Sequence, residues 1–434
     1  MKKAKTNIEQ SEKWLSRAAK VIPSCTQTFS KGPTQFVQGV APIYLERGSG
    51  SHVWDVDGNE YIDYVLGLGC VILGYAYPRV NEAITRQLEK GIAFTLMHPL
   101  EVEVAELIVK HNLSAEMVRF GKNGSDATTG AVRIARAYTG REKVACAGYH
   151  GWHDWFIVST TRNLGVPKFN RELVKCFSYN DIDGLKRIFE ENPTEIAAVI
   201  LEPSTFDEPK GGFLSGVKEL TRKHGALLIF DEVVTGFKIG MSGAQGYYEV
   251  IPDLTCLGKS IANGMPLSAI AGKREIMEVF DRAFYSFTFG GETLSLAAAQ
   301  ATLLELEEKN VHAHLWKLGA SLKDGYNRLV EESDLIDYTR CAGLPPRTLV
   351  RWYEPGKKGD SLLLKSVFQQ ECLKRGVLYT GVQHVCFSHT EEDIAKTLDA
   401  YGEGLAVIKK GVQQGNIEKC LEGKMVEPVF RKLD

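Results

Sequence analysis

The sequence predicts an α/β protein in which one large domain with a mostly parallel sheet is joined to smaller α+β regions. From about residue 80 to 320, short apolar runs alternate with amphipathic helical stretches, as in repeated strand–helix units. A hairpin signal precedes this region, and a mixture of strand and helix patterns follows after about residue 330. We therefore expect an N-terminal arm with a small antiparallel sheet in 1–79, the large domain in 80–330 and a small α+β domain in 331–434.

The N-terminal section begins with helical periodicity over residues 8–22, which stops at Pro23. A segment rich in Gly and Pro follows to about residue 50. The segments 52–56 and 61–65 then flank Asp57-Gly58-Asn59. Asp-Gly between two strand-like segments is a strong signal for a tight turn, so we expect an antiparallel hairpin here.

The elements of the other two sections follow from the same kinds of pattern. In the large domain we expect strands at 117–120, 143–147, 197–201 and 227–230, and helices at 125–138, 217–224 and 294–308. In the C-terminal domain we expect strands at 348–352 and 385–387 around a helix near 361–375. A last helix should open at Thr390, because Asp393 three residues later gives a pattern close to a capping box.

Composition excludes several classes of function. The 52 Lys and Arg residues nearly balance 54 Asp and Glu, and no basic stripe suggests a nucleic-acid partner. No apolar run approaches the roughly 20 residues that span a bilayer, and the N-terminus lacks the apolar core of a secretory signal. With neither a membrane span nor a signal, we expect a cytoplasmic location. Nine scattered cysteines without a CxxC motif argue against a disulfide framework and a zinc site, so we expect reduced thiols and no bound metal.

Chemically useful residues follow the predicted strands, where ligands of open α/β sheets bind. The four strands lead to Asn123-Gly124-Ser125-Asp126, Tyr149-His150, Glu202-Pro203 and Asp231-Glu232. Gly124 and Ser125 open a helix, and free backbone N–H groups, a hydroxyl and the helix dipole suit a phosphate. An ordinary N-cap serine after a turn glycine is the alternative.

Lys259 stands in Leu257-Gly258-Lys259-Ser260, which superficially suggests a nucleotide-binding P-loop. That interpretation fails, because Asp253 occupies the position that requires the first glycine. Small and apolar neighbours instead suggest a confined amine that could form a Schiff base, and a solvated surface lysine is the alternative.

Asp231 ends an apolar strand, where a carboxylate is costly to bury unless it is paired. Its partner could be a cationic ring nitrogen, or it could cap a helix, and Glu202 carries the same two alternatives. Tyr149 belongs to a group of aromatic residues that could form a stacking wall or a plain core cluster. The nearby His150 and His153 do not indicate a metal site, because no HExxH helix or third Cys or His ligand accompanies them.

Together, a phosphate cup, an aromatic ring, an acid at a strand end and a later lysine are the parts that hold pyridoxal phosphate (PLP). Their order and spacing resemble the class III, fold type I aminotransferases, most closely the branch typified by glutamate-1-semialdehyde aminomutase. The resemblance covers nearly the whole chain and runs through Gly48–Gly58, Ile72–Gly74, Asn123–Ala127, Tyr149–Asp154, Leu201–Pro203, Phe230–Phe237, Pro252–Lys259, Phe287–Gly291 and His389–Ile394.

This resemblance implies fold type I, with a small α+β domain formed from the N- and C-terminal segments together. It also implies a role for each matching residue. Lys259 would form the Schiff base and shuttle a proton, and Asp231 would pair with the pyridinium nitrogen. The remaining cofactor contacts would be Gly124 and Ser125 on the phosphate, Tyr149 and Val233 on the two ring faces, Glu202 at its strand end, and Thr288 reaching the phosphate of the neighbouring subunit. A homodimer follows from the last contact.

The chain departs from the aminomutase pattern where substrate is held. Residues 24–33 replace a segment that usually reads like GGVNSPVRAF, and the arginine expected there is missing. Leu68 replaces a substrate-facing tryptophan, whereas NGSDA at 123–127 keeps the Gly and hydroxyl of the usual SGTEA. We therefore expect an aminotransferase that moves an amino group from an amino acid to a carbonyl substrate, such as a sugar-like or specialised keto compound. The alternatives are an aminomutase of the semialdehyde type and a catalytically silent binding protein, and the intact lysine and aspartate argue against the second.

Overall fold

The computed structural model describes residues 7–357 and 359–429, which form two compact units. One unit comprises Pro78–His312, and the other combines residues 7–77 with the described residues from 313 onward. The second boundary lies earlier than the expected 330/331, because helix α12 (Val311–Glu332) packs from its first turn against the C-terminal segment. His314 Nε2 lies 2.9 Å from the carbonyl oxygen of His389, for example.

The larger unit contains a seven-stranded sheet with the order β4-β10-β9-β8-β7-β5-β6. Its strands are β4 (Met117–Gly121), β5 (Lys143–Ala147), β6 (Val174–Cys176), β7 (Ile196–Leu201), β8 (Leu227–Glu232), β9 (Leu254–Leu257) and β10 (Ser268–Gly272). Strands β6, β5, β7, β8 and β9 pair in parallel, and β10 runs antiparallel to both β9 and β4. The expected mostly parallel sheet is confirmed, and all four predicted strands are present.

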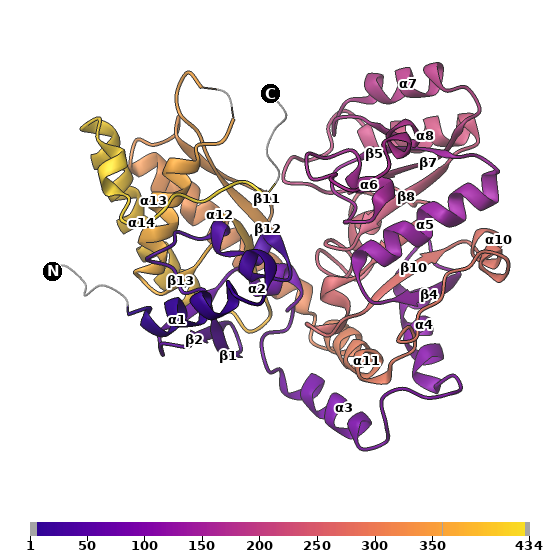
Figure 1. Cartoon of the computed structure of the whole chain (residues 1–434), viewed down its shortest axis with the longest axis horizontal. Helices are drawn as coiled ribbons and strands as arrows, with labels where there is room; N and C mark the ends of the chain where they lie inside the picture. The colour runs from indigo at the N-terminus through magenta and orange to yellow at the C-terminus, as the bar shows by residue number, and fades with distance from the viewer. Residues whose placement is uncertain (1–6, 358, 430–434) are drawn as a thin grey trace. The chain divides into compact units, whose positions relative to one another are not determined.

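Helices cover both faces of this sheet (Figure 1). On one face lie α5 (Gly124–Thr139), α6 (Asp154–Ile157) and α10 (Arg274–Met277), and on the other α7 (Ile182–Glu191), α8 (Phe213–His224) and the segment after α9 (Gly243–Tyr247). Helix α11 (Thr293–Glu308) packs on α3 (Pro78–Leu88) and α4 (Pro99–His111). Every residue of β7 and β8 is buried between these layers, which accounts for the unbroken apolar sequence of β7 and for the apolar residues 227–230 of β8.

The smaller unit contains two sheets and three long helices. Its strands are β1 (Leu45–Ser49), β2 (His52–Asp55), β3 (Glu60–Asp63) and β13 (Val377–Leu378) in one sheet, and β11 (Thr339–Leu344), β12 (Arg347–Trp352) and β14 (Val382–His384) in the other. The predicted hairpin is present as the antiparallel pair β2–β3. Strand β13 pairs in parallel with β3, so the N- and C-terminal segments share one sheet, as the sequence resemblance implied.

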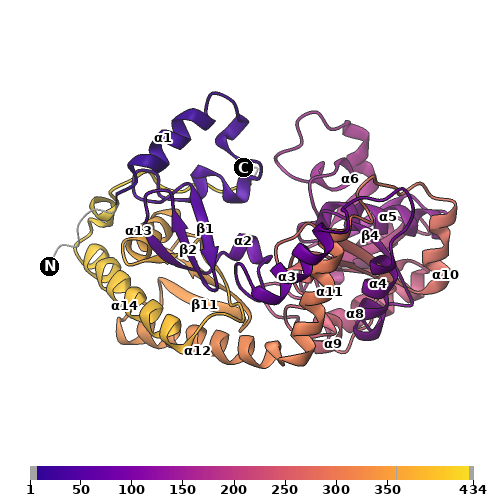
Figure 2. The same ribbon diagram turned by 90° about the horizontal axis from the view of Figure 1, so that it is seen from below.

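The helices of this unit are α1 (Glu9–Ala18), the single turn α2 (Leu66–Gly69), α12, α13 (Leu362–Leu373) and α14 (Glu391–Gln413). Helices α12 and α14 lie side by side (Figure 2), and the rings of Tyr326 and Tyr401 are 5.6 Å apart. The predicted start of α14 is confirmed: the Asp393 N–H donates to Thr390 Oγ1 and the Thr390 N–H donates to Asp393 Oδ2.

Two expectations are wrong in this unit. Helix α1 ends at Ala18 rather than near residue 22. The strand expected at 385–387 lies at 382–384 instead, where β14 pairs with β12. Beyond it the chain turns, because the Phe387 N–H donates to the Ile72 carbonyl and the His389 N–H to that of Cys386. The apolar side chains of residues 385–387 therefore pack in the core, but their backbone does not pair as a β-strand.

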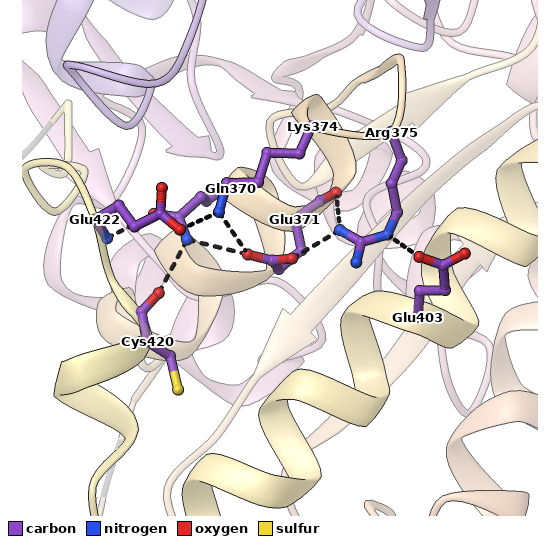
Figure 3. A network of polar contacts seen from close by, with 7 residues as sticks. All are labelled: Gln370, Glu371, Lys374, Arg375, Glu403, Cys420 and Glu422. Atoms are coloured by element: carbon purple, nitrogen blue, oxygen red, sulfur yellow. Dashed lines mark hydrogen bonds and ion pairs between the residues drawn. The ribbon is translucent and has the colours of Figure 1, made fainter. Parts of the chain in front are cut away.

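A polar network holds the end of α13 to its neighbours (Figure 3). Arg375 donates to Glu371 Oε2 at 2.7 Å and to Glu403 Oε2, on α14, at 2.6 Å. Gln370 donates to the Cys420 carbonyl at 2.9 Å in the short 3₁₀ turn Ile417–Cys420. Glu371 is buried, and its ion pairs with Arg375 and Lys374 lower the pKa of its carboxyl despite that burial.

Across residues 7–357 and 359–429, no helix is both long and apolar enough to cross a membrane. Residues 1–6 of the N-terminal segment, for which we expect no secretory signal, lie outside the described part of the chain.

Candidate active site

Seven of the eight predicted site residues lie at the carboxyl edge of the large sheet. Strands β4 and β9 run in the same direction, since each is antiparallel to β10, so their ends meet the ends of β5, β7 and β8 at one edge. The seven are Gly124 and Ser125 after β4, Tyr149 after β5, Glu202 after β7, Asp231 and Val233 at the end of β8, and Lys259 after β9.

Glycines let three of these segments approach one another closely. A Cβ atom added at Gly124 would lie 2.7 Å from Val233 Cγ1, and one added at Gly258 would lie 3.2 Å from the same atom. The Val233 side chain is thus enclosed between the start of α5 and the residue before Lys259. Neither glycine has a positive φ, so close approach rather than backbone conformation requires them.

The start of α5 offers hydrogen-bond donors to this edge. The N–H groups of Gly124 and Ser125 belong to the first turn of the helix, where no intrahelical carbonyl is available. The Trp152 N–H donates to Ser125 Oγ at 3.3 Å, so the segment after β5 is tied to the same turn. Together with the positive end of the helix dipole, this turn can bind an anion.

Asp231 is buried and paired. Only 6% of its surface is exposed, its Oδ2 lies 2.8 Å from His150 Nδ1, and its Oδ1 accepts from the Val233 N–H at 3.2 Å. His150 is itself 1% exposed and its ring stacks parallel to Trp155. Within the described part of the chain, no partner hydrogen-bonds to His150 Nε2. We expect the Nδ1–H tautomer, which lets His150 donate to the carboxylate and hold it in place.

His150 is a residue of this edge to which the sequence assigned no role. Its place after a predicted strand was noted and a metal site was rejected, but its pairing with Asp231 was not predicted, because the two lie 81 positions apart. The available signal was its place at the end of a buried strand, in the same position relative to the sheet as Tyr149, Glu202 and Asp231.

Tyr149 and Glu202 follow the neighbouring strands β5 and β7, on one side of β8. The Tyr149 ring is about half exposed and stands edge-on to Phe156 at 5.5 Å. Burial, and secondarily the nearby Asp231 carboxylate, raise the pKa of its phenol. Glu202 lies beside the chain at Gly148, where an added Cβ would be 3.1 Å from its Oε1.

Lys259 opens the 3₁₀ turn Lys259–Ala262 directly after β9 and Gly258. Its φ of +43° is unusual for a residue with a side chain, and Asn263 at the end of the same turn repeats it. Such left-handed residues each cost on the order of 1–3 kcal/mol and are frequent at functional sites. The turn therefore fixes the direction in which the lysine leaves the sheet.

Thr288 is the one predicted site residue of the eight that does not lie at the carboxyl edge of the large sheet. It lies in an exposed turn before α11 rather than at a strand end. Its neighbours Phe284, Phe287 and Phe289 expose 80%, 37% and 58% of their surfaces. Exposed apolar side chains grouped in this way are typical of interaction surfaces.

Comparison with known proteins identifies the family. Residues 36–377 match the family model for class-III aminotransferases.

The chain belongs to this family.

A 3-aminobutyryl-CoA aminotransferase of Cloacimonas acidaminovorans is 34% identical over 417 residues, covering 94% of this chain and 99% of the relative. A glutamate-1-semialdehyde 2,1-aminomutase of Exiguobacterium is 38% identical over 391 residues, covering 83% and 89%. The solved structure of the PLP internal aldimine form of the Sphingopyxis sp. MTA144 FumI protein superposes with a TM-score of 0.86 at 27% identity, covering 93% and 97%.

This class-III enzyme therefore has the fold type I architecture, depends on PLP, and acts on small-molecule amino and carbonyl compounds. The sheet edge fits the cofactor. The buried carboxylate of Asp231 is held by His150 and the Val233 N–H, and a protonated pyridine nitrogen would add a cationic partner. The first turn of α5 suits the phosphate. Gly124, which has no side chain, forms a cradle with Val233 that any larger residue at position 124 would fill.

Proposed function

We propose that this class-III enzyme is an aminotransferase that moves an amino group from an amino acid to a separate carbonyl substrate, with Lys259 as its Schiff-base lysine. The observation that carries the assignment is the buried His150–Asp231 pair next to the strand that bears Lys259. Asp231 is the register partner of Cys256 in the adjacent β9, three residues before Lys259. The acid and the amine thus come from neighbouring parallel strands at one edge.

When bound, PLP would supply an electron sink for the negative charge that develops on the substrate carbon. Asp231 would keep the pyridine nitrogen protonated, and His150 orients Asp231 through the bond at Nδ1. The Lys259 amine would hold the cofactor and would also accept and return the substrate proton at Nζ.

The remaining contacts position the cofactor. Gly124 and Ser125 bind its phosphate through the first turn of α5. Tyr149 and Val233 pack on opposite faces of the ring, and Glu202 lies beside the segment that carries Tyr149. A homodimer completes the site, with Thr288 reaching the phosphate of the neighbouring subunit. The exposed phenylalanines around Thr288, and Leu96 and Met97, which expose 75% and 82% of their surfaces, support this interface.

Two features support transfer between molecules. The aminomutase pattern is altered at Leu68 and in 24–33, where substrate would be held. The relative from Cloacimonas, which aligns with nearly the whole chain, is named as an aminotransferase of an acyl-CoA with an amino group at C3. We therefore add a 3-keto acyl compound to the sugar-like and other specialised keto compounds as a candidate acceptor class. A cytoplasmic location remains a prediction.

An aminomutase is the second candidate, favoured by relatives of that name at 38% identity. Isotope transfer distinguishes the two. An aminotransferase supplied with a ¹⁵N-amino acid passes the label to an added carbonyl compound and needs both, whereas a mutase moves nitrogen within one substrate without a donor. Lys259→Ala should abolish either reaction, and Lys273→Ala is the matched control, because Lys273 forms an ion pair with Asp253 at the edge of the sheet opposite to Lys259. Full transfer activity in Lys259→Ala would refute the assignment.

A further inference from the structure

Two cysteines that lie far apart in the sequence meet in the large sheet. Cys146 on β5 and Cys176 on β6 are register partners on parallel strands, so their side chains lie on the same face of the sheet. Their Sγ atoms are 3.5 Å apart, which is a thiol–thiol hydrogen bond. The sequence suggested only isolated thiols, because 30 residues separate the pair.

The two thiols differ in environment. Cys146 is 1% exposed and lies in the core under α5, whereas Cys176 is exposed on the edge strand. The hydrogen bond from Cys146, with smaller contributions from the Ser159 hydroxyl, Arg171 and His150, lowers the pKa of Cys176 to about 6. The same bond, together with burial, raises the pKa of Cys146. The accessible sulfur is therefore the more acidic of the two, and the less acidic sulfur lies behind it.

We propose that Cys176 is a site of oxidation by hydroperoxides and that Cys146 is its resolving partner, so that the pair closes reversibly to a disulfide. This proposal is independent of the proposed substrate and of the role of Lys259. It concerns strand β5, which ends at Ala147, two residues before Tyr149.

The chemistry balances in two steps. The Cys176 thiolate attacks one oxygen of the hydroperoxide: an S–O bond forms, the O–O bond breaks, and the leaving oxygen is protonated to water or alcohol. The Cys146 sulfur then attacks the sulfenic sulfur: the S–S bond forms, the S–O bond breaks, and the departing hydroxide takes the Cys146 proton as water. The two thiols lose two electrons, and the hydroperoxide gains them.

The strand geometry permits this bond. Neighbouring strands lie about 4.8 Å apart, within the Cα separations that disulfides span. The sulfurs must approach by about 1.5 Å to reach the length of a disulfide. Strand β6 has only three residues and pairs with β5 alone, so an edge segment can make this adjustment.

The test uses the reduced, PLP-loaded wild-type protein. It is treated with one equivalent of hydrogen peroxide, its remaining thiols are blocked with N-ethylmaleimide under denaturing conditions, and its peptides are mapped by mass spectrometry. We expect a peptide pair linked through Cys146 and Cys176 that separates on reduction with dithiothreitol. An unmodified pair, or oxidation that reaches the partly exposed Cys25, Cys70 or Cys420 first, overturns the proposal.

Variants separate the two roles. In Cys146→Ser, the sulfenic acid at Cys176 should persist and be trapped by dimedone, whereas wild type should trap little. In Cys176→Ser, Cys146 should resist peroxide, and Cys420→Ser should behave as wild type.

At pH 6 we expect Cys176 to react with a disulfide reagent about tenfold faster than the three partly exposed cysteines. Equal trapping in wild type and Cys146→Ser would remove the resolving role and overturn the proposal.

Discussion

Replacing Gly124 with Ala should weaken PLP binding without unfolding the protein. The added Cβ would lie 2.7 Å from Val233 Cγ1, well inside normal contact distance. Val233 or the first turn of α5 must then move by about 1 Å, and overpacking of this size costs about 1–3 kcal/mol. If about 2 kcal/mol of this cost falls on the cofactor-bound state, the Kd for PLP rises about thirtyfold.

The assay is a titration of cofactor-free protein with PLP, followed by visible absorbance, with a thermal melt of each cofactor-free variant to check folding. Gly240→Ala is the matched control, because no atom lies within 4 Å of a Cβ added there and its φ is not positive. We expect Gly240→Ala to bind as wild type. A wild-type Kd in Gly124→Ala would show that the turn and Val233 do not form the cradle, and the reasoning from close approach would be refuted.

Two further predictions concern the smaller unit. A hydrogen bond to Asp393 raises the pKa of His52, so the stability that His52 contributes is complete below about pH 6.5 and is lost as the pH rises through the raised pKa. The melting temperature of His52→Gln should therefore fall furthest below wild type near pH 6, and a gap independent of pH would contradict this. Glu371→Gln, which leaves Arg375 without its buried partner, should lower the free energy of unfolding by about 2–4 kcal/mol in urea titrations. Glu403→Gln removes an exposed partner of the same arginine and should cost less than about 1 kcal/mol, so equal losses would count against the role of burial.

The sequence predicted the parts of the fold that have strong local signals. Strand β7 and residues 227–230 of β8 are buried on both faces and form continuous apolar runs, and the turn at Asp57-Gly58 indicated the first hairpin. Strand β10, with the sequence Ser-Ala-Ile-Ala-Gly, was not predicted. Its small residues give little hydrophobic signal, and its antiparallel pairing depends on partners far away in the sequence.

The candidate site could be predicted where residues follow strands in chain order. Asp231 and Tyr149 were selected in this way, because the topology of a parallel sheet brings strand ends together. Lys259 was selected from its small and apolar neighbours instead, because strand β9 in front of it was not predicted. The His150–Asp231 bond and the Cys146–Cys176 contact could not be predicted, because each depends on which strands become neighbours or near neighbours in the sheet.

The measurement that tests the central claim most directly is the visible spectrum of the PLP-loaded protein during addition of single amino acids, with Lys259→Ala beside it. We predict a yellow band in wild type that one amino acid bleaches while the matching keto acid appears, and no such lysine-dependent band in Lys259→Ala. A variant that keeps the wild-type band and bleaches at the wild-type rate would contradict the assignment of Lys259 and, with it, the proposed site.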